Sequence, residues 1–327
     1  MGAKVMKKFV ALLAALIVFG GADVPARAQD AYPTRPVKIM IAFPVGGLLD
    51  TVSRVVGEKL AGLLGQQFIV EARPGAGGTL ATAAVAKSDP DGYTLMMIND
   101  NHALNPSVFK NIPYDSVKDF APIGFVGYTP LVLIANGALP MHSVKDLVEA
   151  AKQKPDTITY GSVGVGSASH LAGVMLEGAA DIKWQHVPYR GGAPALNDLL
   201  AGHISTMFMS PVVSLQHLQS GKLTALALAA SKRIDVLPNV PTMAEAGFPI
   251  EASYWFGLVA PAGTPPAVLT KLEKALTEVL AMPDVRKRLS DMGAIIQPLN
   301  GKQFGDYIRA EISKWADIVN KAGVKPE

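Results

Sequence analysis

Apolar residues follow two different periods along this chain, and the two periods alternate. Residues 37–43 form a nearly continuous apolar run, which is typical of a buried strand. Pro44 and the pair Gly46-Gly47 break this run, and apolar residues then recur at helical spacing until Gly65. The same change of period recurs through most of the chain. The pattern therefore predicts an α/β protein with two mainly parallel sheets.

Four of the predicted strand-to-helix turns are rich in glycine and serine, and they lie at residues 43–50, 72–79, 161–169 and 186–192. A helix start leaves backbone N–H groups unpaired, and the helix dipole favours negative charge there. Glycine also lets a ligand approach the backbone closely. We therefore expect these turns to gather around one small anion, although many turns of this composition bind nothing.

Two stretches predict where the chain passes between domains. Residues 122–136 form two apolar segments broken at Thr129-Pro130, and residues 254–259 form a single returning strand. We expect two crossing strands to join one lobe, residues 29–130 plus 255–327, to a second lobe, residues 131–254, with a ligand between them. Residues 99–106 are predicted to be a loop too polar for the core, and residues 242–247 a capped helix.

The first 28 residues have the features of a secretory signal peptide. Lys4, Lys7 and Lys8 form a basic start, residues 9–19 are apolar, and Ala26-Arg27-Ala28 is an A-x-A cleavage site. We predict a periplasmic protein whose signal peptide is removed after Ala28. The apolar segment is shorter than the roughly 20 residues of a membrane span. We therefore expect no direct membrane insertion of the mature chain, with a retained anchor as the alternative.

Composition excludes several kinds of function. The chain has a formal net charge of +3, and loss of residues 1–28 removes an equal excess of basic residues, so the mature chain is formally neutral. No broad basic surface remains, and we predict no nucleic-acid partner. The chain contains no cysteine, which excludes disulfides, thiolate catalysis and cysteine-bound metals.

Motifs for catalysis and cofactors are incomplete. Ser162 follows Gly161 and precedes Val163-Gly164, but Tyr160 replaces the first glycine of a nucleophile elbow. No Gly-Lys-Ser/Thr follows a glycine loop, and the dinucleotide fingerprint near Gly164 lacks its third glycine and its acid. The six histidines have no metal-binding spacing. We predict no enzyme, no metal and no cofactor, and keep a serine esterase using Ser162 as the alternative class.

Several longer motifs are shared with a known family. They are FPVGGLLD, RPGAGGT, DPDGYTL, ALNPS, YGSVGVGSASHLAG, HVPYRGGAPALNDLLAGHI, LPNVPTMAEAGFP and WFGLVAPAGTP. With these motifs in this order, the chain resembles the periplasmic solute receptors of the tripartite tricarboxylate transporter system, also called the Bug family. The resemblance covers essentially the whole mature chain. It implies a two-lobed periplasmic binding protein fold (type II-like) that closes on a small carboxylate and passes it to membrane permease subunits.

The resemblance also implies a set of ligand-binding residues. One carboxylate end would be held by the first two glycine loops, at Phe43, Gly46, Gly47, Ala76, Gly77 and Gly78. The other end would meet the second lobe at Ser162, Ser167, Ser169, His170, Tyr189 and Arg190, with Asn101 and His102 at the cleft rim. Asp50 matches the family motif too, and we expect it to brace the first loop.

Several alternatives stay open at this level. His170 either binds a ligand oxygen or caps a helix, and Arg190 suits a second carboxylate because a guanidinium binds it bidentately. The chain departs from the family pattern at Val45, at Leu48-Leu49 and at Ala72. The apolar Leu48-Leu49 pair and Tyr189 make an aromatic carboxylate such as terephthalate the second choice after an aliphatic dicarboxylate. A receptor coupled to a membrane sensor is a further alternative, and we expect a monomer.

Overall fold

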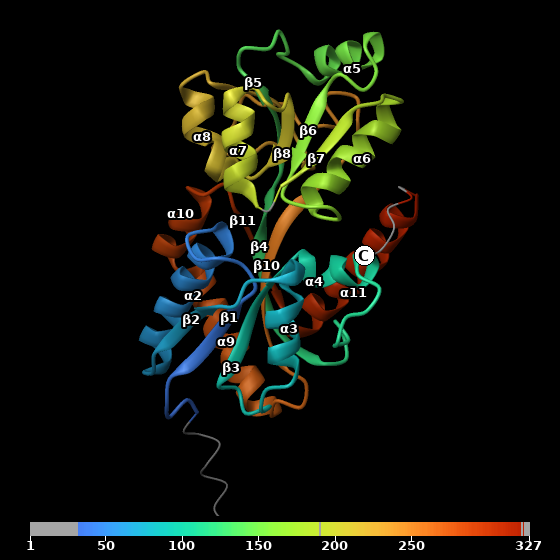
Figure 1. Ribbon diagram of the computed structural model, residues 1–327. Coiled ribbons are helices and arrows are strands. Elements are labelled where there is room, and N and C mark those ends of the chain that lie inside the picture. Colours follow the sequence, from blue (N-terminus) through green and yellow to red (C-terminus); the bar gives the residue numbers. More distant parts are fainter. Residues whose placement is uncertain (1–31, 190, 322, 324–327) are drawn as a thin grey trace, which may run out of the picture.

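The computed structural model describes residues 32–189, 191–321 and 323. The predicted signal peptide and Arg190 lie outside the described residues. The described chain forms two α/β units, each with its own sheet, and they lie one above the other in Figure 1. In this part of the chain, no helix is both long and apolar enough to cross a membrane.

The first unit, at the bottom of Figure 1, contains a six-stranded sheet with the order β11-β4-β10-β3-β1-β2. β1 pairs in parallel with β2 and β3, and the other three pairs are antiparallel. The strands are β1 (Val37–Ile41), β2 (Phe68–Ala72), β3 (Thr94–Asn99), β4 (Phe120–Pro130), β10 (Ser253–Pro261) and β11 (Ile295–Asn300).

The second unit, at the top of Figure 1, contains a five-stranded sheet with the order β7-β6-β8-β5-β9. β6 pairs in parallel with β7 and β8, whereas β5 pairs antiparallel with β8 and β9. The strands are β5 (Val132–Asn136), β6 (Thr159–Ser162), β7 (Gln185–Pro188), β8 (Thr206–Met209) and β9 (Leu223–Leu228).

The α/β fold is thus confirmed, but both sheets are mixed where the sequence predicted mainly parallel ones. The antiparallel pairs involve β4, β10 and β11 in the first sheet and β5 and β9 in the second. Three of these strands, β4, β5 and β10, lie where the chain passes between the two units. Strand direction there depends on how the chain crosses, and local periodicity carries no information about it.

Two strands carry the chain between the units, and both stand at the centre of Figure 1. β4 ends at Pro130 and β5 begins at Val132, so Leu131 alone separates the two sheets. The Leu131 N–H donates to the carbonyl of Ala252 (2.9 Å), one residue before β10 begins. Ala229 N–H donates to Leu131 (2.8 Å), and Ala252 N–H donates to Ala229 (3.0 Å). Short backbone hydrogen bonds therefore tie the crossing segments together.

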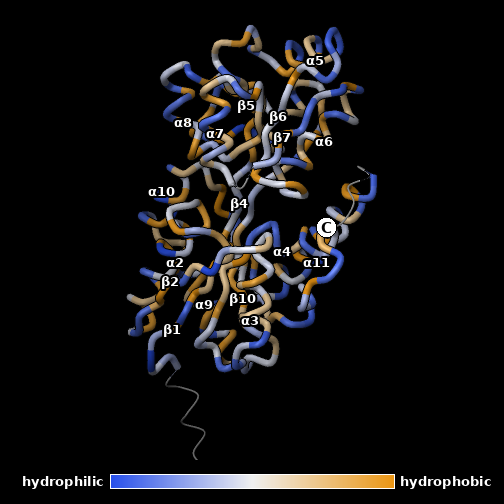
Figure 2. The backbone as a smooth tube through the Cα atoms, viewed as in Figure 1, coloured by the Kyte–Doolittle hydropathy of each residue, from blue (hydrophilic) through white to orange (hydrophobic). Residues whose placement is uncertain are grey.

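Helices cover both faces of each sheet, and the apolar stretches lie largely inside (Figure 2). In the first unit α2, α9 and α10 share one core, and α3, α4 and α11 pack into the other. In the second unit α5 and α6 lie in one core, and α7 and α8 in another. The helices are α2 (Leu48–Leu64), α3 (Thr79–Ala86), α4 (Asn101–Val108), α5 (Val144–Gln153), α6 (Ala168–Ala180), α7 (Gly192–Ala201), α8 (Pro211–Gln219), α9 (Pro266–Ala281), α10 (Pro283–Ser290) and α11 (Gly301–Lys321).

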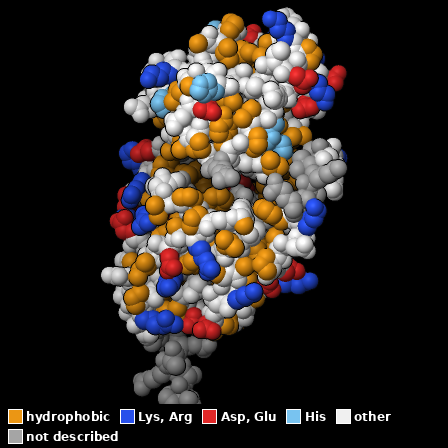
Figure 3. All heavy atoms as spheres, viewed as in Figure 1, with side chains coloured by type: hydrophobic (Ala, Val, Ile, Leu, Met, Phe, Trp, Pro, Cys, Tyr) orange, Lys and Arg blue, Asp and Glu red, His pale blue; other side chains and the backbone are white. Residues whose placement is uncertain are grey.

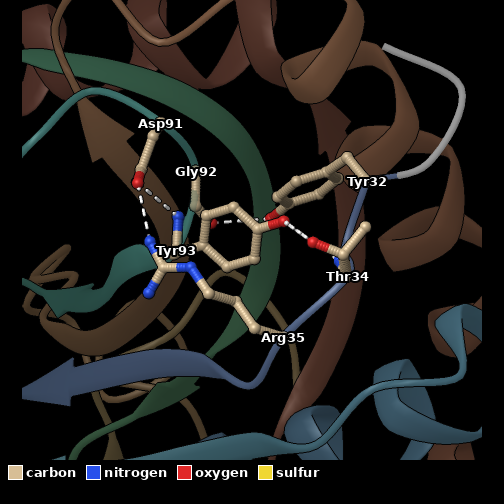
Figure 4. Close-up of polar contacts among 6 residues, drawn as sticks. All are labelled: Tyr32, Thr34, Arg35, Asp91, Gly92 and Tyr93. Carbon is tan, nitrogen blue, oxygen red and sulfur yellow. Dashed lines mark hydrogen bonds and ion pairs between the residues drawn. The ribbon is translucent and has the colours of Figure 1, made fainter. Parts of the chain in front are cut away.

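The start of the described chain is fastened to the turn before β3 (Figure 4). The Tyr32 hydroxyl donates to the Gly92 carbonyl (2.6 Å), and the Thr34 N–H donates to the Tyr93 hydroxyl (3.0 Å). Arg35 pairs with Asp91 (2.9 Å) and lies 3.9 Å over the ring of Tyr93. The DPDGY turn singled out in the sequence therefore anchors the beginning of the folded chain.

Two local predictions were wrong, and two elements were not predicted. Residues 99–106 were expected to be a polar loop, yet residues 101–108 form α4, and His102, Leu104 and Asn105 are buried. The pair Thr242 and Glu245 forms the reciprocal bonds of a capping box, but a turn follows instead of a helix. α10 and β11 were not predicted. β11 contains Pro298, which is tolerated because this strand lies at the edge of the sheet.

Candidate functional site

The first glycine loop joins β1 to α2, and Asp50 braces it. The Asp50 carboxylate accepts the Gly46 N–H (3.0 Å) and the Nε–H of Arg54 (2.9 Å). Burial alone would raise the pKa of Asp50, but the hydrogen bonds from Arg54 and Gly46 hold it below its usual value. Because Asp50 occupies the Gly46 amide, that amide is not available to a ligand. Within the described structure the N-cap Gly47 has no side-chain capping bond, which leaves first-turn amides of α2 for another acceptor.

The second glycine loop follows β2 and lies beside the first. Ala76, Gly77 and Gly78 all have positive φ angles, of 45°, 60° and 95°, a conformation that favours glycine. A Cβ placed at Gly78 would lie 3.0 Å from the Cβ of Ala42 and 3.8 Å from the ring of Phe43. The two loops are therefore adjacent at the carboxyl ends of parallel strands β1 and β2, where α/β folds commonly bind ligands.

Helix α4 and the residue after it support the second loop. The Asn105 Nδ2 donates to the carbonyl of Gly77 (3.1 Å) and to the Tyr114 hydroxyl (3.3 Å). A Cβ at Gly77 would meet the ring of Phe109 at 2.8 Å. The motif ALNPS, which includes Asn105, thus holds the glycine loop in place from a helix that the sequence did not predict.

In the second unit, the loop between β6 and α6 is held by its own serines. Ser167 Oγ donates to the Gly164 carbonyl (2.6 Å), lies 3.0 Å from Ser169 Oγ and accepts the His170 N–H (3.3 Å) as the N-cap of α6. Ser169 Oγ accepts the Val163 N–H (3.1 Å). All three of Ser162, Ser167 and Ser169 are buried. Their hydroxyls therefore shape the loop.

Two stacked histidines, His170 of α6 and His186 of β7, lie beside this loop. Nδ1 of His170 accepts the Gly166 N–H (3.0 Å), which is the capping role left open by the sequence. The ring of His170 stacks on that of His186 with centroids 4.0 Å apart, and His186 in turn stacks on Tyr160. Burial lowers the pKa of both His170 and His186 to about 4, and for His186 the neighbouring His170 adds to the effect. Both rings are therefore neutral at pH 7.

Three further predicted residues have mostly structural contacts. The Tyr189 hydroxyl donates to Asp198 in α7 (2.7 Å), and burial together with this bond raises the pKa of Tyr189 to about 12. His102 was predicted at the cleft rim, but it is buried and its Nε2–H donates to the carbonyl of Ser116 (2.8 Å). Asn101 is half-buried and accepts a long hydrogen bond from Asn99 (3.4 Å).

The loops of the two units approach each other. A Cβ at Gly166 would lie 2.7 Å from Cγ1 of Val108, so the second unit's loop rests on the end of α4. Tyr254 of the crossing strand β10 packs against both cores of the first unit. Burial raises the pKa of Tyr254, nearby Asp100 adds to this, and a hydrogen bond with Ser169 of the second unit opposes it. Figure 3 shows a hollow between the units on the viewed face, bordered largely by hydrophobic side chains.

Sequence reasoning missed several groups near these loops. His186 lies in the quoted motif HVPYRGG but was not singled out, and its contact with Ser162 depends on pairing between β6 and β7. Asp100 is fully buried at the carboxyl end of β3, and neither carboxylate oxygen has a hydrogen-bond partner among the described residues. Burial raises the pKa of Asp100 to about 8, and Glu311 adds to the effect. The described residues hold no cluster of three or more metal-ligating side chains.

Residues 52–324 match the model of the tripartite tricarboxylate transporter family receptor. The chain belongs to this family. Among solved structures it is similar to the periplasmic binding protein BugD (37% identity, TM-score 0.82), over 90% of this chain and 100% of that one. An R. palustris protein solved with adipate is 31% identical (TM-score 0.85; 90% and 100% coverage). MatC from Rhodopseudomonas palustris, solved with malate, is 34% identical (TM-score 0.78; 88% and 100% coverage).

Membership in the tripartite tricarboxylate transporter receptor family fixes the class of this protein. Receptors of this family are periplasmic solute-binding proteins that take small carboxylates and work with transporter components, and they are not enzymes. The predicted family and receptor class are therefore confirmed. The esterase alternative based on Ser162 is excluded by the same finding, and Ser162 is fully buried besides.

Proposed function

We propose that this receptor binds a small aliphatic dicarboxylate between two lobes and delivers it to the membrane permease subunits of a tripartite tricarboxylate transporter. The lobes are residues 29–130 plus 255–327 and residues 131–254. The signal peptide directs export and is removed after Ala28, and the receptor acts in the periplasm as a monomer.

One observation carries this proposal: glycine- and serine-rich loops of both units lie at the carboxyl ends of parallel strands and approach one another. The contact of Gly166 with Val108 brings the β6–α6 loop to the first unit. The close packing of Gly78 on Ala42 joins the first two glycine loops. A ligand between these loops would touch both lobes, and its binding would favour the closed arrangement.

The first carboxylate would be held mainly by backbone N–H groups. No described side chain caps the start of α2 at Gly47, so the backbone N–H groups there can bind a carboxylate. Gly77 and Gly78 have no Cβ atoms, so a ligand can approach the backbone of the neighbouring loop. Gly46 contributes shape only, because Asp50 takes its amide. The serines and His170 set the conformation of the opposing loop, and Arg190 remains the proposed partner of the second carboxylate.

The choice of an aliphatic dicarboxylate rests on two similar proteins, one solved with adipate and the other with malate. The aromatic alternative was motivated partly by Leu48, Leu49 and Tyr189. Leu49 is buried in the core under α2, and the hydroxyl of Tyr189 is bonded to Asp198. These contacts weaken the case for an aromatic ligand such as terephthalate.

Calorimetry on the mature protein tests the proposal, with succinate, malate, adipate, citrate and terephthalate as the panel. We expect heat with at least one aliphatic dicarboxylate and little with terephthalate. Gly47→Val should weaken binding at least about tenfold, because the new side chain stands where the ligand meets the helix start. The fold should tolerate it, since a Cβ at Gly47 meets only the Pro44 carbonyl at 3.6 Å.

Gly62→Val is the matched control, because a Cβ at this exposed position of α2 meets nothing within 4 Å. It should leave ligand affinity unchanged. Absence of heat with every carboxylate would refute the proposed ligand class.

Uptake assays in cells lacking the receptor distinguish a permease partner from a membrane sensor, because only a receptor that serves a permease is needed for uptake. Light scattering tests whether the protein is a monomer.

A further inference from the structure

A cavity in the described structure lies away from the glycine loops. Its volume is about 520 Å³, within the range of small-molecule sites. One wall is the segment 232–236 of the second unit, and the other is formed by α10 and residues 293–296 of the first unit. None of the predicted carboxylate-binding residues lines it among the residues described.

Basic side chains dominate the lining of this cavity. Lys232 and Arg233 come from the second-unit wall, Arg286 and Lys287 from α10, and Asp235 is the acidic side chain among them. A cavity with four cations and one carboxylate attracts anions, and the cations on its two walls face a shared space.

Two of these cations are not neutralised by a neighbouring acid. Arg233 pairs with Glu245 (3.0 Å) and Lys287 with Asp291 (2.8 Å). Neither Lys232 nor Arg286 has an acidic partner in the described part of the chain, although one Arg286 nitrogen donates to the carbonyl of Leu280 (3.3 Å). One unneutralised cation thus stands on each wall.

The two units touch at Gly293, one of the residues that line the cavity. A Cβ at Gly293 would lie 3.4 Å from the side chains of both Pro211 and Val236. The glycine therefore lets the walls come together at this point, next to the buried side chain of Ile234. The distance between Lys232 and Arg286 depends on this contact and hence on the relative position of the units.

We propose that this cavity is a second ligand site, which binds a compact multivalent oxyanion between Lys232 and Arg286. Arg286 offers planar N–H groups that suit two oxygens of one anion, and Lys232 supplies a point charge from the opposite wall. An anion held by both walls stabilises the arrangement of the units described here. By linkage, it then changes affinity at any site whose ligand also bridges the units.

The probe is inorganic pyrophosphate, titrated into the mature protein in 150 mM NaCl, with inorganic phosphate as a second arm. We expect one binding event per chain. The double variant Lys232→Met/Arg286→Met should weaken it about tenfold or more, because two charge-assisted contacts are lost. Citrate is titrated into the Gly47→Val variant, in which binding at the glycine loops is weakened. Comparison with pyrophosphate then shows whether the cavity prefers a polycarboxylate or a phosphate.

Lys118→Met/Lys145→Met is the matched control, since it removes the same charge from two highly exposed positions outside the cavity. It should leave pyrophosphate binding unchanged. Equal loss in both double variants would show a general charge effect and overturn the proposal, as would unchanged binding in Lys232→Met/Arg286→Met. Failure of every carboxylate to bind at the glycine loops would affect the proposed function and leave this test intact.

Discussion

The Oγ of Ser162 lies 2.7 Å from Nε2 of His186, and the two residues occupy neighbouring parallel strands, β6 and β7. The same hydroxyl is 3.0 Å from the carbonyl of Gly164 and accepts the Gly164 N–H at 3.2 Å. It has one proton, so it donates either to Gly164 or to His186. A serine beside a neutral histidine is the pair that starts acyl transfer in hydrolases, but here burial of Ser162 turns the pair into a loop support.

Ser162→Ala tests this structural role. We expect a loss of about 1–3 kcal/mol in the free energy of unfolding, because His186 and the Gly164 amide lose their partner. Urea unfolding measures the loss, and Ser220→Ala, which removes an exposed hydroxyl, should change stability far less. Hydrolysis of p-nitrophenyl acetate should be absent from both the native protein and Ser162→Ala. Turnover that depended on Ser162 would contradict the support role.

Acid should destabilise the protein through its buried histidines. Burial lowers the pKa values of His102, His170 and His186 to about 4, whereas unfolded histidine titrates near 6.5. Between these values the unfolded chain binds more protons, so stability falls as the pH drops from about 6.5 to 4. Each histidine contributes up to about 3 kcal/mol.

Urea unfolding at pH 7, 6 and 5 checks this slope. His170→Gln should reduce the slope, and His142→Gln, at an exposed position, should leave it unchanged. A pH-independent unfolding free energy over this range in the native protein would show that these histidines titrate normally.

Asp100 should act in the opposite direction. Its pKa is raised to about 8 by burial, with Glu311 adding to the effect, so between about pH 4 and 8 the folded state holds a proton that the unfolded state has lost. Stability therefore falls as the pH rises through this window, by up to about 1.4 kcal/mol per pH unit. Asp100→Asn keeps the shape without a charge and should raise the unfolding free energy by about 1–3 kcal/mol at pH 8.

The comparison at pH 5 is the internal check, because Asp100 is already protonated there and Asp100→Asn should have little effect. Asp317→Asn provides a matched control at an exposed position of α11. An equal change in stability at pH 5 and pH 8 would argue against a protonated Asp100.

The brace of Asp50 on the first glycine loop predicts a graded effect on ligand binding. Asp50→Asn keeps an oxygen that can accept the Gly46 N–H, whereas Asp50→Ala removes it. Both variants leave Arg54 without its ion pair. We expect calorimetry to show a small loss of affinity for Asp50→Asn and about tenfold weaker binding for Asp50→Ala. Identical affinities in the two variants would mean that the Gly46 contact does not position the loop.

The sequence by itself determined the strand-loop-helix units and their glycine turns. Residues 37–64 and 266–281 follow the predicted periods because burial of one helix face and of a short strand depends on residues close together in the chain. Ser143 and Ser210 occupy the N-cap positions of α5 and α8, where serine is favoured by the same short-range effects. The glycine-rich motifs and their order along the chain indicated the family without any knowledge of tertiary contacts.

Only the tertiary structure decided which buried polar side chains form hydrogen bonds, because their partners lie far away in the chain. Asn101–Val108 looked too polar for the core, yet His102 finds the carbonyl of Ser116 and Asn105 that of Gly77. Ser162 meets His186 across two strands, and Lys232 and Arg286, which come from different units, line one cavity. Local patterns record which residues prefer burial; the long-range fold determines whether a buried polar atom has a partner.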